Sequence, residues 1–583
     1  MKTLFTSVFL GLGFIAFGQN YNPAKTNWQD AGYRGTKPTF STVLNILNYG
    51  ADNTGILSCN HALDSAIYSL NAAPGVILFP NGQYYFDQKI NLSQSNIVLR
   101  GAGYDSSKLI FNLHGRVSNL INISGSSTND TSSFSTDAIR GNFSAIINNP
   151  ANFHAGDWVY LSMNDSAFMT SSWAYGSLGQ TMQIQSVSGN SIIFKSPFRF
   201  NYFLSKSPKI RRIIPVNSIG FECLKIQRMD STAGQSSNIA FTNAVNCWIN
   251  GIESYSCNFA HVELNYSSNI EVTNSYFHGA FGYGGGGQGY GVLIQFATGE
   301  CKVEGNYFNH LRHSMVLQAG ANGNVLAYNY STHPYWTEPS LPDSAAGEIV
   351  LHGNFPFSNL AEGNFVNNIV IDDSHGKNGP LNTFFRNRAS GYGIFMNFSP
   401  ATDSQQFIGN EITNTNIGLN FINGKGHFLY GNNYRGAVVD GSTSTPDSSL
   451  YLLPEQRPDC FSANITWPVV GTLTGYNQGT IYAKARVEMG HPAACSCVTI
   501  PTGFPTVLRS GNLEISPNPA RESFEIKALN IQEISVYGFS GRQLISLKNP
   551  ANNKVDVTSL APGLYLVRIQ IQGQEIVRKL TKL

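Results

Sequence analysis

Short apolar runs that end at an asparagine recur through the middle of the chain. Between about residues 238 and 440 the closing positions are Asn250, Asn274, Asn306, Asn329, Asn364, Asn387, Asn410 and Asn432. Most of these positions follow one another at 22 to 24 residues, and two intervals are longer, at 32 and 35. One coil of short strands and tight turns has this length, and insertions are tolerated at its turns. The pattern therefore predicts an all-β parallel β-helix whose asparagines stack from coil to coil.

The composition agrees with stacked coils. Only 12% of the 583 residues are charged, against about a quarter in an average globular protein. Stacking sets equivalent side chains directly over one another, and like charges there would repel. Helical bundles and coiled coils, which need charged outer faces, are therefore disfavoured. The formal net charge of +2 provides no basic surface for a nucleic acid, so we expect no nucleic-acid partner.

The N-terminus has the features of an export signal over residues 1–18. Lys2 precedes the apolar stretch Leu4–Phe17, and Ala16-Phe17-Gly18 is a small-x-small cleavage site. No later segment reaches membrane-spanning length. The eight cysteines are then expected to form disulfides rather than metal sites, and Cys460 would pair with Cys495 or Cys497 near the end of the main domain.

The segment before the repeat resembles a known family. Val43–Gly55, the helical Asn60–Ala72, Gly75–Tyr84 and Asn96–Gly103 are similar to the N-terminal start of pectate-lyase-superfamily proteins. The resemblance implies a right-handed parallel β-helix over residues 41–465, after an N-terminal linker at 19–40, with the helix capping the open core. Residues 140–205 lack the period and predict a β-rich insertion, which either borders a substrate groove or packs against the solenoid.

The last segment, residues 511–583, predicts a small β-sandwich of short strands. Its motifs SPNPA, VYGFSGRQL and LAPGLYLVRI resemble the type A C-terminal sorting domain of the type IX secretion system. This resemblance implies the type IX machinery as a partner, transport across the outer membrane, and a secreted or surface-attached protein. A cysteine-containing linker, residues 466–510, would join it to the β-helix.

Registering the coils on their closing asparagines places polar residues in columns. One column holds His278, His310 and His333, another Gln295, Gln318, His352 and His375, and a third Tyr290, His313 and Glu348. Two insertions, Gly282–Gly289 and Pro334–Pro342, bracket these columns. A polar strip beside aromatic loops is typical of a sugar-binding cleft, although stacked polar side chains are also the norm in repeats without any function. The expected substrate-binding residues are Arg312, His313, Glu348, His352, Arg388, Tyr335 and Trp336.

The densest cluster of charge runs from Asp372 to Arg388. A lyase acting on a uronate polymer must neutralise the sugar carboxylate, remove the neighbouring proton and protonate the leaving oxygen. The expected catalytic residues are Asp372, Asp373, His375, Lys377 and Arg386, with His375 or Lys377 as base and Arg386 or Arg388 on the carboxylate. Glu348, Asp372 and Asp373 would hold Ca²⁺, the one cofactor expected.

The sequence thus predicts a secreted, monomeric enzyme that cleaves an acidic polysaccharide by β-elimination. Two alternatives remain open. A glycoside hydrolase of the same fold would take its acid and base from Asp372, Asp373 and Glu348. A non-catalytic adhesin or glycan-binding solenoid would scatter the polar residues around the circumference. Ser374-His375 departs from the Gly-His-Gly motif of the hydrolases, and their Arg-x-Lys and the lyases' arginine pattern have no clear equivalent.

Overall fold

A computed structural model of the chain describes residues 21–397, 401–440, 445–454, 456–461, 465–471, 479–500, 515–526, 531–538, 543–550, 552–571 and 574–583. The expected signal, residues 1–18, lies outside the described residues. The chain divides into two compact units, residues 1–502 and 503–583. No helix in the described part combines the length and apolarity needed to cross a membrane.

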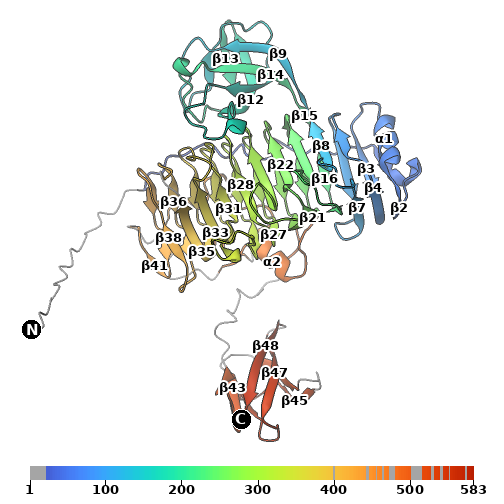
Figure 1. Ribbon diagram of the computed structural model, residues 1–583, viewed down its shortest axis with the longest axis vertical. Helices are drawn as coiled ribbons and strands as arrows, with labels where there is room; N and C mark the ends of the chain where they lie inside the picture. Colours follow the sequence, from blue (N-terminus) through green and yellow to red (C-terminus); the bar gives the residue numbers. More distant parts are fainter. Residues whose placement is uncertain are drawn as a thin grey trace, which may run out of the picture. The chain divides into compact units, whose positions relative to one another are not determined.

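The first unit contains the predicted parallel β-helix (Figure 1), with three strand-bearing faces. The first face is one parallel sheet of twelve strands: β1 (Val43–Asn45), β3 (Gly75–Phe79), β6 (Ile97–Gly101), β16 (Gly220–Glu222), β20 (Trp248–Asn250), β23 (Glu271–Thr273), β26 (Lys302–Glu304), β29 (Val325–Ala327), β32 (Leu360–Glu362), β34 (Thr383–Phe385), β36 (Gln406–Ile408) and β39 (Phe428–Tyr430).

The second face follows the first after a tight turn in each coil. Its strands are β2 (Thr54–Ser58), β4 (Gly82–Phe86), β7 (Ser107–Phe111), β17 (Lys225–Arg228), β21 (Glu253–Cys257), β24 (Tyr276–Ala280), β27 (Tyr307–Asn309), β30 (Tyr330–Thr332), β37 (Glu411–Ile412) and β40 (Asn433–Tyr434), which the short β41 (Ala437–Val438) pairs antiparallel.

The third face completes each coil. Its strands are β5 (Ile90–Leu92), β8 (Ile121–Ser124), β18 (Ile239–Thr242), β22 (Ala260–Asn265), β25 (Tyr290–Gln295), β28 (His313–Leu317), β31 (Ile349–Leu351) and β38 (Leu419–Phe421). The long strands β33 (Phe365–Asp372) and β35 (Arg388–Asn397) pair with strands of both the second and third faces and join them. A short pair, β15 (Val216–Asn217) and β19 (Ala244–Val245), lies in the turn region that leads back to the first face.

The predicted asparagine ladder lies inside the corner between the first two faces. The ladder runs through Asn306, Asn329, Asn364, Asn387, Asn410 and Asn432, and each of the first five donates to the amide oxygen of the next asparagine at 2.9–3.0 Å. A second internal ladder, Asn324–Asn359–Asn382–Gln405, lies at another corner. The rest of the interior is apolar, because inward positions of successive strands hold aligned Val, Ile, Leu, Met and Phe.

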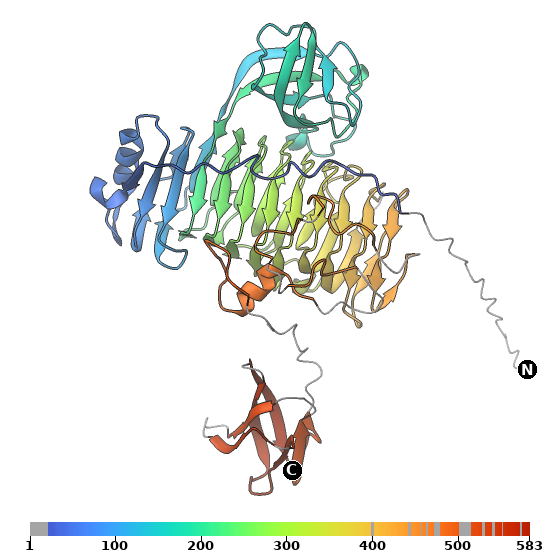
Figure 2. The ribbon, with the colours of Figure 1, turned by 180° about the vertical axis from the view of Figure 1, so that it is seen from behind.

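The N-terminal end of the solenoid is closed by helix α1 (Asn60–Ser69) and a 3₁₀ turn η1 (Ile46–Tyr49), as the resemblance implied. Residues 21–40, expected to be a linker, are instead a strap that crosses the coils (Figure 2). Trp28 of the strap is buried and donates its indole N–H to the Ser358 carbonyl at 2.8 Å. Tyr33 packs edge-on against Trp248 at 5.5 Å. The strap therefore belongs to the β-helix unit.

The insertion spans residues 126–214, wider than the predicted 140–205. It is an antiparallel sheet in the order β10-β13-β12-β11-β14-β9: β9 (Ser126–Ser133), β10 (Ser144–Ile146), β11 (Trp158–Ser162), β12 (Gly179–Ser188), β13 (Ser191–Phe194) and β14 (Lys209–Ile214). Two 3₁₀ turns accompany it, η2 (Ser172–Ala174) and η3 (Leu204–Lys206). Its apolar core includes Ala319 and Phe357 of the solenoid turns, so the insertion packs directly on the turns that follow the third face.

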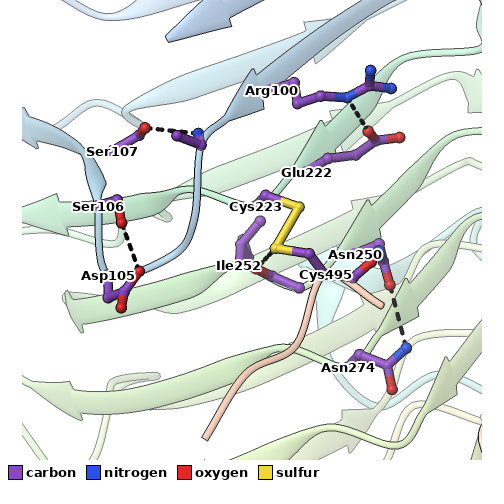
Figure 3. Close-up of a disulfide and its surroundings, with 12 residues drawn as sticks. Arg100, Asp105, Ser106, Ser107, Glu222, Cys223, Asn250, Ile252, Asn274 and Cys495 are labelled. Carbon is purple, nitrogen blue, oxygen red and sulfur yellow. Dashed lines mark hydrogen bonds and ion pairs between the residues drawn. A yellow bond between two sulfur atoms is a disulfide. The ribbon is translucent and has the colours of Figure 1, made fainter. Parts of the chain in front are cut away.

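After β41 the described parts of residues 445–500 lie along the first face as an arm, which contains helix α2 (Tyr482–Glu488). Two disulfides hold this arm. Cys223 pairs with Cys495 (Figure 3), and Cys460 pairs with Cys497, which resolves the alternative left by the sequence. The remaining Cys59, Cys247, Cys257 and Cys301 are buried and free.

The second unit contains two antiparallel sheets, as predicted for a small sandwich. One has β42 (Ile515–Ser516), β43 (Ser523–Ile526) and β46 (Lys554–Asp556), and the other has β45 (Gln543–Lys548), β44 (Ile531–Tyr537), β47 (Gly563–Ile571) and β48 (Gln574–Lys582). They enclose their own core, which includes Phe524, Ile534, Val555 and Val567.

Candidate functional site

A groove of about 560 Å³ lies on the outside of the third face, over β22, β25, β28 and β31. Two loops that precede these strands, 281–289 and 333–346, contact each other through Thr337 N–H and the Tyr283 carbonyl at 3.2 Å. The insertion adjoins the opposite ends of the strands. The lining residues are Trp173, Gln235, Phe259, Glu263, Gly286, Gly287, Tyr290, Gln295, Phe296, Arg312, Gln318, His352 and His375.

A polar ladder runs along the groove at the ends of the third-face strands. Gln318 donates to Gln295 at 2.7 Å, and Gln295 donates to Glu263 at 3.1 Å. The pairing register continues this row through His352 and Asp372. The predicted column Gln295, Gln318 and His352 is therefore a row of neighbours. The next position in the row was predicted to be His375 but is Asp372, because β33 continues to Asp372 without a turn.

A buried guanidinium lies among the rings of the groove. Arg312 immediately precedes β28 and is only 9% exposed. Its Nη1 donates to the Tyr290 hydroxyl at 3.4 Å, and Nε has no hydrogen-bond partner among the described residues. Its Cζ lies 5.8 Å from the centre of the Tyr290 ring. Because neither contact neutralises the charge, Arg312 is suited to bind an anionic group of a ligand.

The rings of Tyr290, His313, His352 and His375 form a cluster beside this arginine. The ring of His313 lies 5.3 Å from that of Tyr290 and 5.7 Å from that of His352, measured between centroids. His313 Nδ1 donates to the Gly347 carbonyl at 2.8 Å, which fixes its tautomer. His375 stacks on His352 at 4.8 Å, with an interplanar angle of 18°.

His352 is the best placed of these groups to move a proton. Its Nε2 lies 3.7 Å from Oδ2 of Asp372, whereas Nδ1 is buried and has no hydrogen-bond partner within the described part of the chain. Burial lowers the pKa of His352 to about 4, although Asp372 opposes the shift. Burial also raises the pKa of Tyr290, with Arg312 acting in the opposite direction. Near neutral pH the imidazole is therefore an unprotonated base beside a protonated phenol.

The insertion supplies an aromatic side chain to the groove. Trp173, in η2, is 49% exposed and meets Phe296 edge-on at 6.0 Å. The backbone N–H groups of Thr170 and Ser171 both donate to the side chain of Asn354 at 3.1 Å. These bonds tie the η2 loop to the solenoid turn that follows His352. Of the two alternatives for the insertion, the structure shows both: it packs on the solenoid and borders the groove.

Five of the predicted site residues come together here: Arg312, His313, His352, Asp372 and His375. Glu348 and Asp373 are placed differently. Glu348 is fully buried and accepts hydrogen bonds from the backbone N–H groups of Asn367 and Asn368, so it cannot bind substrate. Asp373 points away from its neighbour Asp372 and accepts from the backbone N–H of Thr402 at 2.9 Å.

The remaining predicted cations are used elsewhere. Lys377 pairs with Asp403 at 3.1 Å and does not line the groove. Arg386 is buried under the arm, where its guanidinium donates to the carbonyls of Thr445 and Asp447. Arg388 lies over the Phe365 ring on the second face, at 4.3 Å from its centre. Arg386 and Arg388 were expected to bind the sugar carboxylate, but neither lies at the groove. Segments distant in sequence pack against both arginines and hold them elsewhere.

The two aromatic residues of the long insertion also lie outside the groove lining. Tyr335 stacks on His310 at 4.8 Å, and Trp336 donates to the Pro342 carbonyl at 2.7 Å. They support the loop beside the groove. In the predicted histidine column, His278 pairs in register with Asn309 rather than with His310, so the three histidines do not form one row.

The expected calcium ligands do not converge. Glu348 is bound by backbone amides, Asp373 by Thr402 and Asn378, and Asp372 faces His352. No group of three or more His, Cys, Asp or Glu side chains suited to a metal occurs among the described residues.

Sequence reasoning missed Trp173, Phe259, Phe296 and Glu263 as lining residues. Glu263 could have been inferred from the repeat. It lies two residues before Asn265, which pairs in register with Gln295 of the predicted polar column. Trp173 had no such signal, since the insertion lies outside the repeat.

Comparisons with known proteins agree with this architecture. Residues 514–582 match the family described as "Secretion system C-terminal sorting domain", and residues 43–190 match "Rhamnogalacturonase A/epimerase, pectate lyase-like". No curated protein matches the chain.

Solved structures with a similar fold include two from different sources. The tailspike protein gp49 from Pseudomonas phage LKA1 is 15% identical with a TM-score of 0.49, and the match covers 63% of this chain and 64% of the tailspike, less than two thirds of its length. A hyperthermoactive exopolygalacturonase from Thermotoga maritima is 11% identical with a TM-score of 0.34, and the match covers 71% of this chain and 96% of the enzyme.

The sorting-domain match indicates export by the type IX secretion system to the cell surface or medium. The strand topology and the N-terminal match agree on the fold of the larger unit. The chain therefore consists of a pectate lyase-like β-helix domain followed by a secretion-system C-terminal sorting domain.

Proposed function

We propose that the groove on the third face binds an acidic polysaccharide and cleaves it by β-elimination. The observation that carries this proposal is the buried Arg312 beside Tyr290 and His352, in a groove bordered by Trp173. A guanidinium neutralises the carboxylate of a uronate and thereby acidifies the neighbouring C–H bond. Exposed aromatic rings suit the apolar faces of sugar rings.

In the proposed reaction His352 is the base and Tyr290 the acid. The C–H bond next to the carboxylate breaks, its proton passes to His352, and its electron pair forms a C=C bond. The C–O bond to the leaving sugar breaks, and the oxygen takes the phenolic proton of Tyr290. The ring centroids of Tyr290 and His352 lie 6.3 Å apart, so both reach one sugar ring, and proton return from His352 to Tyr290 restores the site.

Asp372 would assist by holding His352. Its carboxylate lies 3.7 Å from Nε2 and stabilises the imidazolium that forms in the reaction. Asp372 is therefore a positioning residue in this scheme, and His375, stacked on the same ring, restricts its rotation.

The geometry disfavours hydrolysis by a carboxylate pair. Such pairs stand about 5 to 9.5 Å apart. Glu263 on β22 and Asp372 on β33 are four strands apart in the sheet, which at about 4.8 Å per strand is roughly 19 Å. Asp373 and Glu348, the other expected acids, are directed away from the groove.

The test is to incubate the purified protein with a panel of uronate-containing polysaccharides and follow the ultraviolet absorbance of the new conjugated double bond. Elimination predicts this absorbance with every new chain end. His352→Ala should lower kcat by roughly 10² to 10⁴, while His114→Ala, an exposed turn residue outside the groove, should match the wild type. Reducing ends without the absorbance would establish hydrolysis, and binding without cleavage would establish a glycan-binding solenoid.

A further inference from the structure

The groove holds little positive charge for a site that binds an acidic polymer. Among its lining residues within the described chain, Arg312 is the only lysine or arginine. Glu263 also lines the groove, and Asp372 adjoins His352 at its edge. The fixed charges of this region are therefore one guanidinium and two carboxylates.

The two carboxylates flank the guanidinium along the solenoid axis. Arg312 immediately precedes β28, Glu263 lies on β22 and Asp372 ends β33. The sheet order places β25 between β22 and β28, and β31 between β28 and β33. Each carboxylate is thus two strands from the level of Arg312, or about 10 Å at the usual strand spacing.

No cation among the described residues pairs with Glu263. Its oxygens accept hydrogen bonds from Ser237 at 2.7 Å, Asn265 at 3.0 Å and Gln295 at 3.1 Å. None of the ion pairs found among the described residues includes it. Three neutral donors hold this carboxylate in place without removing its charge, so a second anion nearby would be repelled.

Between the two carboxylates the groove presents uncharged polar groups. Gln295 and Gln318 form the ladder there, linked by a bond of 2.7 Å. Amides of this kind donate to and accept from sugar hydroxyls. Gln318 lies at the level of Arg312 and Gln295 one strand closer to Glu263, so the groove suits an uncharged sugar on the Glu263 side of Arg312.

From this charge pattern we propose that the substrate is a heteropolysaccharide whose uronates are isolated between uncharged sugars, rather than a polyuronate. The inference rests on the proposed elimination at Arg312 and goes further, to the substrate class. One carboxylate of the chain binds Arg312. Additional carboxylates on neighbouring sugars would approach Glu263 on one side and Asp372 on the other.

The test compares two polymers: a polygalacturonate, and a heteropolysaccharide with one glucuronate among several neutral sugars in each repeat. The wild type should show the higher kcat/KM on the heteropolysaccharide. Glu263→Gln keeps the side-chain shape and removes its charge, and it should raise the ratio of kcat/KM for the polyuronate to that for the heteropolysaccharide by about fivefold. Added salt should raise the same ratio for the wild type and less so for the variant. Asp64→Asn, an exposed site on α1, removes the same charge far from the groove and should leave the ratio unchanged.

The outcomes separate this inference from the proposed function. If the wild type prefers the polyuronate, or if Glu263→Gln leaves the ratio unchanged, the inference is wrong while elimination stands. If neither polymer yields unsaturated products, the proposed function itself fails and the inference falls with it.

Discussion

Six asparagines show how single side chains hold one corner of this β-helix. In the ladder from Asn306 to Asn432, the side-chain amide of each of the first five asparagines donates to a backbone carbonyl of the preceding coil and to the next asparagine. The amide oxygen also accepts a backbone N–H, as Asn387 does from Asn364 at 3.0 Å. Because a buried unpaired amide costs roughly 1 to 3 kcal/mol, each rung stabilises both its own turn and the register of its neighbour.

Single buried histidines make the stability of the fold depend on pH. His261 is buried inside the solenoid, where it contacts Ser254 Oγ at 2.8 Å and the Gly279 carbonyl at 3.1 Å. Burial, aided by nearby His278, lowers its pKa from 6.5 to about 3. The unfolded chain therefore binds a proton that the folded chain excludes, so stability falls as the pH drops from 6.5 towards 3.

We expect the free energy of unfolding to be lower at pH 4 than at pH 7 by about 3 kcal/mol from His261 alone. The lowered pKa values of His313 and His352 act in the same direction. Urea unfolding at the two pH values measures the difference. His261→Gln should reduce it, whereas His114→Ala, at an exposed site, should not. Equal losses in wild type and His261→Gln would contradict the assignment to this residue.

At the scale of elements, the insertion contributes to the groove through one loop. The η2 loop is held by two backbone bonds to Asn354, and this asparagine follows the groove residue His352 by two positions. The sheet β9–β14 also buries Phe357 and Ala319 of the adjoining turns. The position of Trp173 therefore depends on the docking of the insertion onto the solenoid.

Trp173→Ala should weaken polysaccharide binding without unfolding the protein. The indole is half exposed, so its loss removes a stacking surface and little core packing. We expect KM to rise about fivefold to tenfold with kcat nearly unchanged, because Trp173 neither accepts nor donates a proton in the proposed elimination. Tyr175→Ala is the matched control, since Tyr175 is equally exposed in the same loop but does not line the groove. A fall in kcat alone would place Trp173 in the chemistry instead.

At the scale of the β-helix unit, strap and arm cover the first face while the groove lies on the third. The strap crosses from Gln406, which donates to the Ala24 carbonyl, to the coils near Trp248. The arm adds bonds such as Leu450 N–H to Glu362 at 2.8 Å. The arm also contacts two of the predicted cluster residues: Arg386 donates to the carbonyls of Thr445 and Asp447, and Arg388 donates to the Gly479 carbonyl.

Loss of the Cys460–Cys497 disulfide should loosen the arm before the solenoid. A cross-link closing a loop of this size stabilises by about 3 to 4 kcal/mol, and the two cysteines are 37 positions apart. For Cys460→Ser/Cys497→Ser we expect faster proteolysis within residues 445–500 and an unchanged β-helix core. Limited proteolysis with mass spectrometry measures this, with Cys59→Ala, a buried free thiol, as control. Uniform cleavage across the chain would contradict an arm that opens independently.

The amino-acid sequence by itself determined the parallel β-helix, the sorting domain and part of the polar row on the third face. These features are periodic or contiguous: the 23-residue spacing aligns Gln295 with Gln318, and the tail motifs occupy one segment. The sequence did not determine the exact register of every coil. In the coil of Asn274, the residue beside Asn306 in the ladder is Ser275 and not the predicted Asn274.

Only the tertiary structure decided which charged residues are available for chemistry. Asp372 and Asp373 are neighbours in sequence, but alternation along an extended strand turns them to different surroundings. Arg386 and Glu348 satisfy backbone groups in the interior, whereas Arg312 keeps an uncompensated charge in the groove. The physical reason is that a buried charge is fixed by whatever distant segment packs against it, and neither the arm, the strap nor the insertion has a period that reveals its docking site.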